Sequence, residues 1–283
     1  MDRLLLVDGS NLLFQMFYGM PNAILDGKGR DIRGAVGFLG ALRKILKMTE
    51  PTHVAVLFDG ECENSRTQTD ENYKANRPDY SQMAEEETPF CQLPIIYRAL
   101  DVLGICHRET ECCETDDWIA GYALTYGGKM EVVISSFDSD YFQLITDQVS
   151  VLRYRGERSV VWTPRTVKEK LGIFPVQYAD FKSLTGDSAD NIPGVPKVGP
   201  KTAAMLINRF SDLETLLAQA ECIERPGLRA SIQTSQERLR LNYSLIRLEN
   251  REELPFVWEE LAWESVAYNT WQVLETAGVP TKG

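Results

Sequence analysis

The sequence predicts an α/β fold in which a mostly parallel central sheet is flanked by helices and carries a helical subdomain. Three short apolar runs support this prediction, at residues 4–7, 54–58 and 132–134, and each is soon followed by an aspartate. Continuous apolar runs of this kind are typical of parallel strands buried on both faces. Segments with helical spacing lie between these runs, so strands and helices alternate along the chain.

The first two expected strands each lead directly into an acidic residue. Residues 4–7 precede Asp8, and residues 54–58 precede Asp59. A single aspartate after a strand is most often a turn former or a helix cap. Open parallel sheets bind their ligands at the carboxyl ends of the strands, so aspartates that recur at several strand ends indicate a shared site.

The stretch from Gly60 to about Phe90 lacks a sustained period and is rich in polar residues. So long a stretch inside a compact domain is usually functional or disordered, and a solvated loop is the alternative interpretation. Tyrosine and basic side chains close to this shared acidic site would suit stacking on a base and contact with a phosphate. We therefore expect a lid or arch over the site, with these nucleic-acid-binding residues: Arg66, Tyr73, Lys74 and Arg77.

More acids follow along the chain. The run 114–117 occupies the first turn of an expected helix, where the helix dipole favours negative charge. So many carboxylates in one place would repel each other unless divalent cations neutralised them, and all-oxygen ligands suit Mg²⁺ or Mn²⁺ better than zinc. The predicted metal ligands are Asp8, Asp59, Glu114, Asp116, Asp117, Asp138, Asp140, Asp187 and Asp190.

A second basic region lies between residues 190 and 207. Two glycines flank a tight turn there, and Pro200 stands at a favoured first position of a helix. Backbone amides at that helix start would cradle a phosphate and grip a duplex without reading its sequence. An ordinary helix-turn-helix packing element is the alternative. The expected DNA-binding residues are Gly194, Lys197, Gly199, Lys201 and Thr202.

The net charge of −11 is opposite to the basic character expected of a nucleic-acid binder. Nine acids belong to the predicted metal site, however, and without them the net charge would be near −2. The distribution of the basic residues therefore matters more than their total.

Composition also argues against several other classes of protein. No apolar stretch approaches the roughly 18 residues of a membrane span, and no basic region precedes the first strand, so we expect a cytoplasmic protein with no membrane partner. The six cysteines show no CxxC spacing, and the chain has only two histidines. A zinc site and a disulfide framework are therefore both disfavoured.

Six motifs together resemble the 5′ nuclease family of flap endonucleases and 5′–3′ exonucleases, which includes the N-terminal nuclease domain of bacterial DNA polymerase I. The match runs in order from about residue 4 to residue 217. The resemblance implies a PIN-like nuclease core at 1–174 with a helical arch at 60–90. It also implies a helical subdomain at 175–283, with a helix-three-turn-helix at 182–208 and a C-terminal segment that has no motif. The motifs are VDGSN, FDG, YKANRP, ETDDWIAGYA, SSFDSDYFQLI and LTGDSADNIPGVPKVGPKTA.

The same resemblance implies a structure-specific 5′–3′ exonuclease and 5′-flap endonuclease that uses two Mg²⁺ ions, with Mn²⁺ as a substitute. It implies catalytic roles for Asp8, Lys74 and Asp138, with Lys74 near the scissile phosphate, and a K⁺ ion at the helix-three-turn-helix. The expected substrates are branched or 5′-ended duplex DNA and RNA–DNA primer junctions, acted on by a monomer in replication or repair. The first metal would be bound by Asp8, Asp59, Glu114, Asp116 and Asp138, and the second by Asp140, Asp187 and Asp190, with Asp117 in an outer position.

The chain departs from the family pattern at three points. Gln15 stands where the family usually has an arginine, and Phe137 and Ser139 replace a glycine and a lysine beside the expected metal ligands. No polymerase domain is present in the sequence, so we expect a stand-alone nuclease. Two alternatives remain open at this point: a DNA-junction binding protein with weak or lost catalysis, and a PIN-like ribonuclease.

Overall fold

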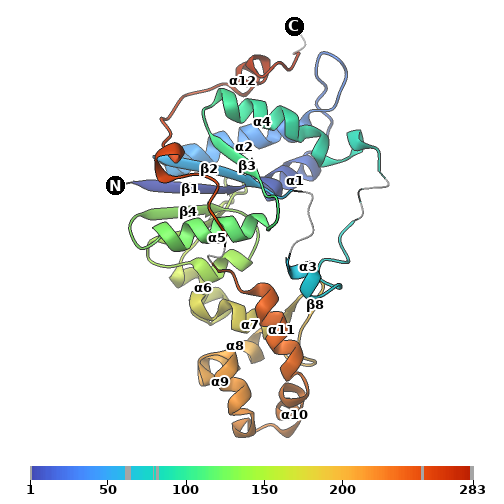
Figure 1. The fold of residues 1–283 in the computed structure, drawn as a ribbon, viewed down its shortest axis with the longest axis vertical. Helices are drawn as coiled ribbons and strands as arrows, with labels where there is room; N and C mark the ends of the chain where they lie inside the picture. The colour runs from blue at the N-terminus through green and yellow to red at the C-terminus, as the bar shows by residue number, and fades with distance from the viewer. Residues whose placement is uncertain (1, 61–64, 79, 81–82, 250–251, 281–283) are drawn as a thin grey trace.

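The computed structural model describes residues 2–60, 65–78, 80, 83–249 and 252–280 (Figure 1). Its centre is a six-stranded sheet with the strand order β3-β2-β1-β4-β5-β6. All neighbouring pairs are parallel except β5 and β6, which are antiparallel, so the predicted mostly parallel sheet is confirmed. The strands are β1 (Arg3–Asp8), β2 (His53–Phe58), β3 (Cys106–Glu109), β4 (Glu131–Ser135), β5 (Val149–Arg153) and β6 (Val160–Trp162).

The central strand β1 explains the apolar runs of the sequence. It pairs with β2 on one side and with β4 on the other, and residues 4–7 are fully buried. Both faces of the sheet are covered, so neither the odd nor the even positions of the strand face water. Because β1, β2 and β4 run in the same direction, their carboxyl ends meet at one edge of the sheet.

One face of the sheet is covered by α1 (Gly9–Gly19), α2 (Arg33–Thr49), α4 (Leu93–Val102) and α12 (Thr270–Thr276) (Figure 1). The core on this side contains Leu5, Val7 and Phe58 from the strands, and Phe38 and Leu42 from α2. The side chains of α2 that enter this core recur three and four residues apart, as a half-buried helix requires.

The opposite face is covered by α5 (Thr115–Tyr126), and the helical subdomain lies beyond it (Figure 1). A single apolar core joins the two parts, because Leu4 and Leu6 of β1 belong to the same buried cluster as Leu206 and Leu216 of the subdomain. The subdomain contains α6 (Pro164–Leu171), α7 (Tyr178–Thr185), α8 (Pro200–Phe210), α9 (Leu213–Ala218), α10 (Pro226–Thr234) and α11 (Gln236–Ile246).

The polar stretch after β2 contains one short helix, α3 (Ser65–Thr69), and two 3-10 turns, Glu85–Glu87 and Pro89–Gln92, within its described residues. The parts of the expected arch at 61–64, 79 and 81–82 lie outside the described residues. In Figure 1 this stretch projects from the side of the molecule, beside the hairpin that precedes α8.

The C-terminal segment packs on the α/β core, although its position in the sequence grouped it with the helical subdomain. The backbone N–H of Trp263 donates to Thr52 (2.8 Å), and its indole N–H donates to the carbonyl of Leu103 (3.1 Å). Val273 and Leu274 of α12 are buried with α2 and α4. Packing of apolar side chains against distant elements explains why no local motif marks this segment.

In the part of the chain that the structure describes, none of the helices combines the length and the apolar character needed to cross a membrane. Among the cysteines that the structure describes, those at 106, 112 and 222 are free thiols.

Candidate metal centre and nucleic-acid interface

The carboxyl edge of the sheet begins with Asp8, which caps the N-terminus of α1. One of its carboxylate oxygens accepts from the backbone N–H of Asn11 (3.0 Å), and the other accepts from the hydroxyl of Ser136 (2.9 Å). Burial, together with the nearby charge of Asp59, raises the pKa of Asp8 to about 7. Asp59 in turn accepts from the backbone N–H of Thr115 (2.9 Å), which fastens β2 to the start of α5.

Asp138 and Asp140 lie in the turn that follows β4. The N–H of Asp138 donates to the Ser136 hydroxyl (3.0 Å), and the N–H of Asp140 donates to the carboxylate of Asp138 (2.8 Å). These bonds fold the residues after β4 back on themselves. The two carboxylates of the motif are therefore held at the same edge as Asp8.

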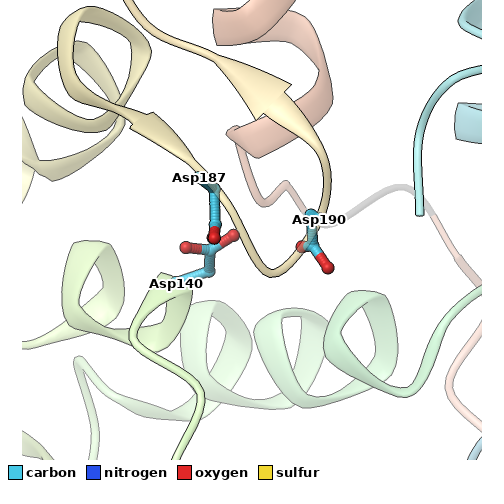
Figure 2. Close-up of side chains that lie close together, drawn as sticks. All are labelled: Asp140, Asp187 and Asp190. Atoms are coloured by element: carbon cyan, nitrogen blue, oxygen red, sulfur yellow. The ribbon is translucent and has the colours of Figure 1, made fainter. Parts of the chain in front are cut away.

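Asp140, Asp187 and Asp190 form a carboxylate cluster that could hold a metal ion, with one oxygen of each within 4.8 Å of the others. Figure 2 shows the carboxylates of Asp140 and Asp187 directed toward one another, with Asp190 beside them. Asp187 lies on β7 (Gly186–Asp187), and Asp190 lies in the turn before β8 (Ile192–Pro193). The two-stranded hairpin of the helical subdomain thus brings its acids onto the edge of the sheet.

Lys182, in the last turn of α7, lies at this cluster and was not found by sequence reasoning. Its ammonium group contacts Asp140 (2.5 Å) and Asp187, and about a tenth of each side chain is exposed. Burial raises the pKa of Asp140 to about 7 even though Lys182 opposes the shift. Burial alone would also raise the pKa of Asp187, but Lys182 holds it below its ordinary value. The sequence shows only that this lysine precedes Asp187 by five residues, and its burial against the acids appears in the structure alone.

The start of α5 supplies three more acids. Glu114 and Asp117 form a capping box, in which each side chain accepts from the backbone N–H of the other residue. Arg66 of α3 bonds to all three acids of this turn, at 3.0 Å to Asp116 and 2.7 Å to Asp117, and also to Glu114. The side chain of Arg66 is about nine-tenths buried, so these ion pairs lie in the interior. Burial raises the pKa of Asp116 well above its ordinary value, although Arg66 opposes the shift.

Tyr73 and Lys74 also face Glu114. The tyrosine hydroxyl donates to one carboxylate oxygen (3.1 Å), and the lysine ammonium group donates to the other (2.5 Å). Burial alone would raise the pKa of Glu114, but Lys74 and Arg66 hold it below its ordinary value. The backbone of Lys74 is left-handed (φ 58°), and its N–H donates to the carbonyl of Asp190 (3.0 Å). Residues 70–77 therefore join the two groups of acids.

The four basic and aromatic residues predicted to bind DNA in this stretch differ in their surroundings. Arg66, Tyr73 and Lys74 are directed at carboxylates, and Tyr73 is only 5% exposed. The side chain of Arg77 is half exposed and bonds to Asp190 (3.0 Å). Of the four, Arg77 is thus the residue whose charge is most open to solvent.

The tight turn predicted between Gly194 and Gly199 forms at residues 195–198, where the N–H of Val198 donates to the carbonyl of Val195 (3.0 Å). The hairpin before it is also tightly folded. Gly186 has a left-handed backbone (φ 75°), and a Cβ added at Gly194 would lie 2.3 Å from the carbonyl oxygen of Thr185. At the start of α8, Gly199 is the N-cap residue and forms no side-chain cap, so the first amides of the helix remain available. The nearby Lys197 and Lys201 are exposed, and Thr202 is half-buried.

The donor set fits a hard divalent cation. The predicted ligands are all carboxylates, and buried basic side chains already balance part of their charge. Oxygen ligands and excess negative charge are the features that Mg²⁺ and Mn²⁺ sites require. The compact set is Asp140, Asp187 and Asp190, while the acids at the start of α5 are held by Arg66 and Lys74.

Two family models match the chain over almost its whole length. The model of the N-terminal resolvase-like domain of 5′–3′ exonucleases matches residues 3–172, and the model of the C-terminal SAM fold of the same proteins matches residues 173–269. The chain belongs to the 5′–3′ exonuclease family. The resemblance inferred from the motifs is thereby confirmed, and the boundary between the two models lies between α6 and α7.

Relatives within the 5′–3′ exonuclease family include both separate proteins and parts of larger ones. The 5′–3′ exonuclease of Aquifex aeolicus is 31% identical over 249 residues, which cover 88% of this chain and 82% of that protein. The thermostable DNA polymerase I of Thermus filiformis is 36% identical over 254 residues, which cover 89% of this chain but only 29% of the polymerase. The chain therefore spans about three-tenths of the length of its polymerase relatives.

A solved structure shows the same fold. The bacteriophage T5 flap endonuclease, in a pseudo-enzyme-product complex with DNA and metal ions, has a TM-score of 0.69 and 23% identity over 86% of this chain and 88% of that one. This likeness confirms the fold of the 5′–3′ exonuclease core and its helical subdomain.

Proposed function

We propose that this chain is a structure-specific 5′–3′ exonuclease and 5′-flap endonuclease that hydrolyses DNA phosphodiester bonds with two divalent cations. The observation that carries the proposal is the position of the carboxylate cluster. Acids from three strand ends, from the start of α5 and from the β7–β8 hairpin lie at one edge of the sheet, and the helix start that follows the hairpin has amides suited to binding phosphate. Family membership gives the class of reaction.

Bound Mg²⁺ ions, with Mn²⁺ as a substitute, would supply an activated water and neutralise the charge that develops on the leaving oxygen. Asp140, Asp187 and Asp190 would hold one ion. Asp8, Asp59, Glu114, Asp116 and Asp138 would hold the other, with Asp117 holding the capping box of α5 in place. The all-oxygen ligand set supports this choice of metal.

The side chains around the acids would position the DNA. Lys74 lies 2.5 Å from Glu114 and would contact the scissile phosphate once a metal ion balances the charge of that carboxylate. Arg77, which is half exposed, would bind a neighbouring phosphate. Arg66 and Tyr73 are directed at carboxylates, so they would contact the 5′ strand only if α3 and the turn after it moved. The duplex would lie on Gly194, Lys197, Gly199, Lys201 and Thr202.

The preferred substrate would be branched or 5′-ended duplex DNA, including RNA–DNA primer junctions. The likeness to a flap endonuclease solved with DNA supports the branched substrate. Removal of primers and flaps in replication or repair follows from that substrate class. A K⁺ ion at the hairpin and action as a monomer are supported by the family resemblance.

Single-turnover cleavage of a labelled 5′-flap duplex with Mg²⁺ tests the proposal, with nicked, blunt and single-stranded DNA as comparisons. Asp138→Ala serves as the blank, because it removes a carboxylate between the two groups of ligands. We expect cleavage near the flap junction that Asp138→Ala abolishes while DNA binding persists. Cleavage by this variant at the wild-type rate would contradict the site assignment.

The same assay distinguishes two other functions. Tight flap binding without cleavage in Mg²⁺ or Mn²⁺ would indicate a junction-binding protein with no catalysis. Faster cleavage of an RNA hairpin than of the matched DNA flap would indicate a ribonuclease. The hairpin before α8 argues against the ribonuclease, because cleavage of single-stranded RNA does not require a duplex-binding element.

A further inference from the structure

Phe137 is a half-buried aromatic residue next to a predicted metal ligand. It follows β4 and immediately precedes Asp138 at the carboxyl edge of the sheet. Its backbone is fixed from both sides, because its N–H donates to the side chain of Asn11 (3.0 Å) and its carbonyl accepts from Arg153 (2.8 Å). The backbone that carries the ring is therefore held by α1 and β5.

Two arginines lie against this ring. The guanidinium carbon of Arg155 is 4.9 Å from the ring centroid, and that of Arg153 is 5.9 Å away. Arg153 is also packed on Phe142 and Trp162, at 4.7 and 5.4 Å, so its role is to hold the aromatic residues together. Arg155 is exposed, and among the described residues it forms no ion pair.

The backbone of Arg155 is held in place although its side chain faces solvent. The amide group of Gln15 on α1 donates to the carbonyl of Tyr154 (2.9 Å), and the N–H of Arg155 donates to the hydroxyl of Ser159 (2.9 Å). The turn continues through Gly156, whose backbone is left-handed (φ 59°). The guanidinium group therefore extends from a fixed base beside the ring of Phe137.

A fixed aromatic ring and an exposed guanidinium group are complementary to the two parts of a nucleotide. Base stacking on an aromatic ring tolerates every base, and arginine binds phosphate through parallel N–H donors. The position is informative as well, because Phe137 directly precedes the predicted ligand Asp138, while Arg155 forms no ion pair among the described residues. Arg155 instead packs against the ring, and its side chain remains exposed to solvent.

We propose that Phe137 and Arg155 form a nucleotide-binding subsite beside the metal centre. The ring of Phe137 stacks on the base of a nucleotide next to the scissile phosphate, and Arg155 binds the phosphate that follows it. The inference rests on the proposed function and deepens it, because it assigns substrate contacts to the ends of β4 and β5. The ligand is a DNA strand, and the contact is independent of base identity.

The stacking contact is tested by single-turnover cleavage of 5′-flap DNA. One abasic residue is placed in turn at each position around the cut bond. For the wild-type protein we expect a loss of about tenfold or more when the abasic residue occupies one position. Phe137→Leu should lose a similar factor on unmodified DNA and little more on that abasic substrate. The phosphate contact of Arg155 is tested in the same way, by replacing single phosphates of the DNA with neutral methylphosphonates and comparing the wild type with Arg155→Gln.

Phe174→Leu and Arg165→Gln are the control variants, since the ring of Phe174 is exposed beside Lys168 and Arg165 pairs only with Glu169 on the surface of α6. Affinity measured by anisotropy, with Ca²⁺ in place of Mg²⁺, provides a second readout. If the wild type cleaves normally and both Phe137→Leu and Arg155→Gln cleave within about twofold of its rate, the subsite proposal is wrong. The proposed nuclease function is then unaffected. If the wild type does not cleave but binds intact DNA more tightly than abasic DNA, and this preference depends on Phe137, the proposed nuclease function is wrong. The subsite proposal then remains supported.

Discussion

At the scale of single residues, Lys182 is the basic side chain that balances the charge of the carboxylate cluster. Its ammonium group faces Asp140 and Asp187 where all three side chains are nearly buried. Removing one partner of a buried ion pair is more damaging than losing the attraction, because it leaves an uncompensated charge in the interior. Lys182 therefore stabilises the metal-free protein.

We expect Lys182→Met to lower the free energy of unfolding in EDTA by about 3 kcal/mol, since two buried carboxylates lose their counter-charge. Saturating Mg²⁺ or Mn²⁺ should restore part of this loss, because a bound cation neutralises the same carboxylates. Urea unfolding with and without metal measures both effects. In the control variant Arg165→Met, an exposed pair with Glu169 is broken, and the loss should be below about 0.5 kcal/mol. Equal losses in the two variants would contradict the stabilising role of Lys182.

Site residues could be predicted where the sequence places them at the end of a strand or helix. Asp8, Asp59 and Asp138 each follow a buried strand, so their shared location followed from the parallel sheet. Lys182, Arg153 and Arg155 could not be found in this way. Their partners come from distant elements, and a local pattern does not record which face of a helix or turn meets the site.

At the scale of elements, the loop between β8 and α8 contains two glycines, Gly194 and Gly199, with different surroundings. A Cβ at Gly194 would collide with the backbone of Thr185 and Gly186, whereas a Cβ at Gly199 would meet open space. The first glycine is thus required by the fold. The second is free for any role that depends on what approaches the helix start.

We expect Gly194→Ala to lower stability by about 1–3 kcal/mol, because the backbone must move to accept the added carbon. Gly199→Ala should leave the melting temperature within about 2 °C and still weaken duplex binding several-fold, since the new methyl group would stand where a phosphate approaches the amides. Thermal unfolding and anisotropy with a blunt duplex measure the two properties. Unchanged duplex binding by a stable Gly199→Ala protein would contradict phosphate binding at this helix start.

Arg66 ties α3 to the first turn of α5 through three carboxylates. We expect Arg66→Ala to accelerate hydrogen exchange of the amides in residues 65–78 by about tenfold or more, because this segment then loses its buried anchor. Mass spectrometry of the exchanged peptides measures the effect, with β1 and β2 as internal references. Arg238→Ala, which breaks an exposed pair with Asp70 of the same segment, should have a smaller effect. The same acceleration in both variants would argue against a special role for Arg66.

Elements with a clear period could be predicted from the sequence, and irregular ones could not. The strands ending near Asp8, Asp59 and Asp138, the helix after Glu114 and the helix after Gly199 all form as expected. Residues 60–90 have no period, so only their polarity indicated an exposed segment. Their contacts with α5 and with the β7–β8 hairpin depend on tertiary structure.

At the scale of the whole molecule, the net charge of −11 requires that DNA be bound through local basic groups. Lys197 and Lys201, near the start of α8, are exposed, and among the described residues they form no ion pair. Each phosphate contact made by a lysine adds about one to the slope of log affinity against log salt concentration.

We therefore expect the double variant Lys197→Ala/Lys201→Ala to bind duplex more weakly and to reduce this slope by about 2. Fluorescence anisotropy with Ca²⁺, over a range of KCl concentrations, measures the slope. The control is Lys28→Ala/Lys44→Ala, which removes the same charge from the α2 side of the sheet. An unchanged slope in the hairpin variant would place the duplex elsewhere.

The mostly parallel fold was predictable as a whole, because buried parallel strands and family motifs agree along most of the chain. The course of the C-terminal segment was not, since Trp263 and Leu274 pack on the core through contacts that have no local signature. Packing of this kind depends on shape at a distant surface.

The strand order also governs when the site can exist during synthesis. Asp8 lies on β1, the first of the six sheet strands along the sequence, yet its neighbour β4 begins at residue 131, and the carboxylate cluster is completed only by Asp190. A nascent chain shorter than this carries an incomplete set of the predicted ligands. Under the proposed function, a complete metal site would therefore form only in one late step of synthesis.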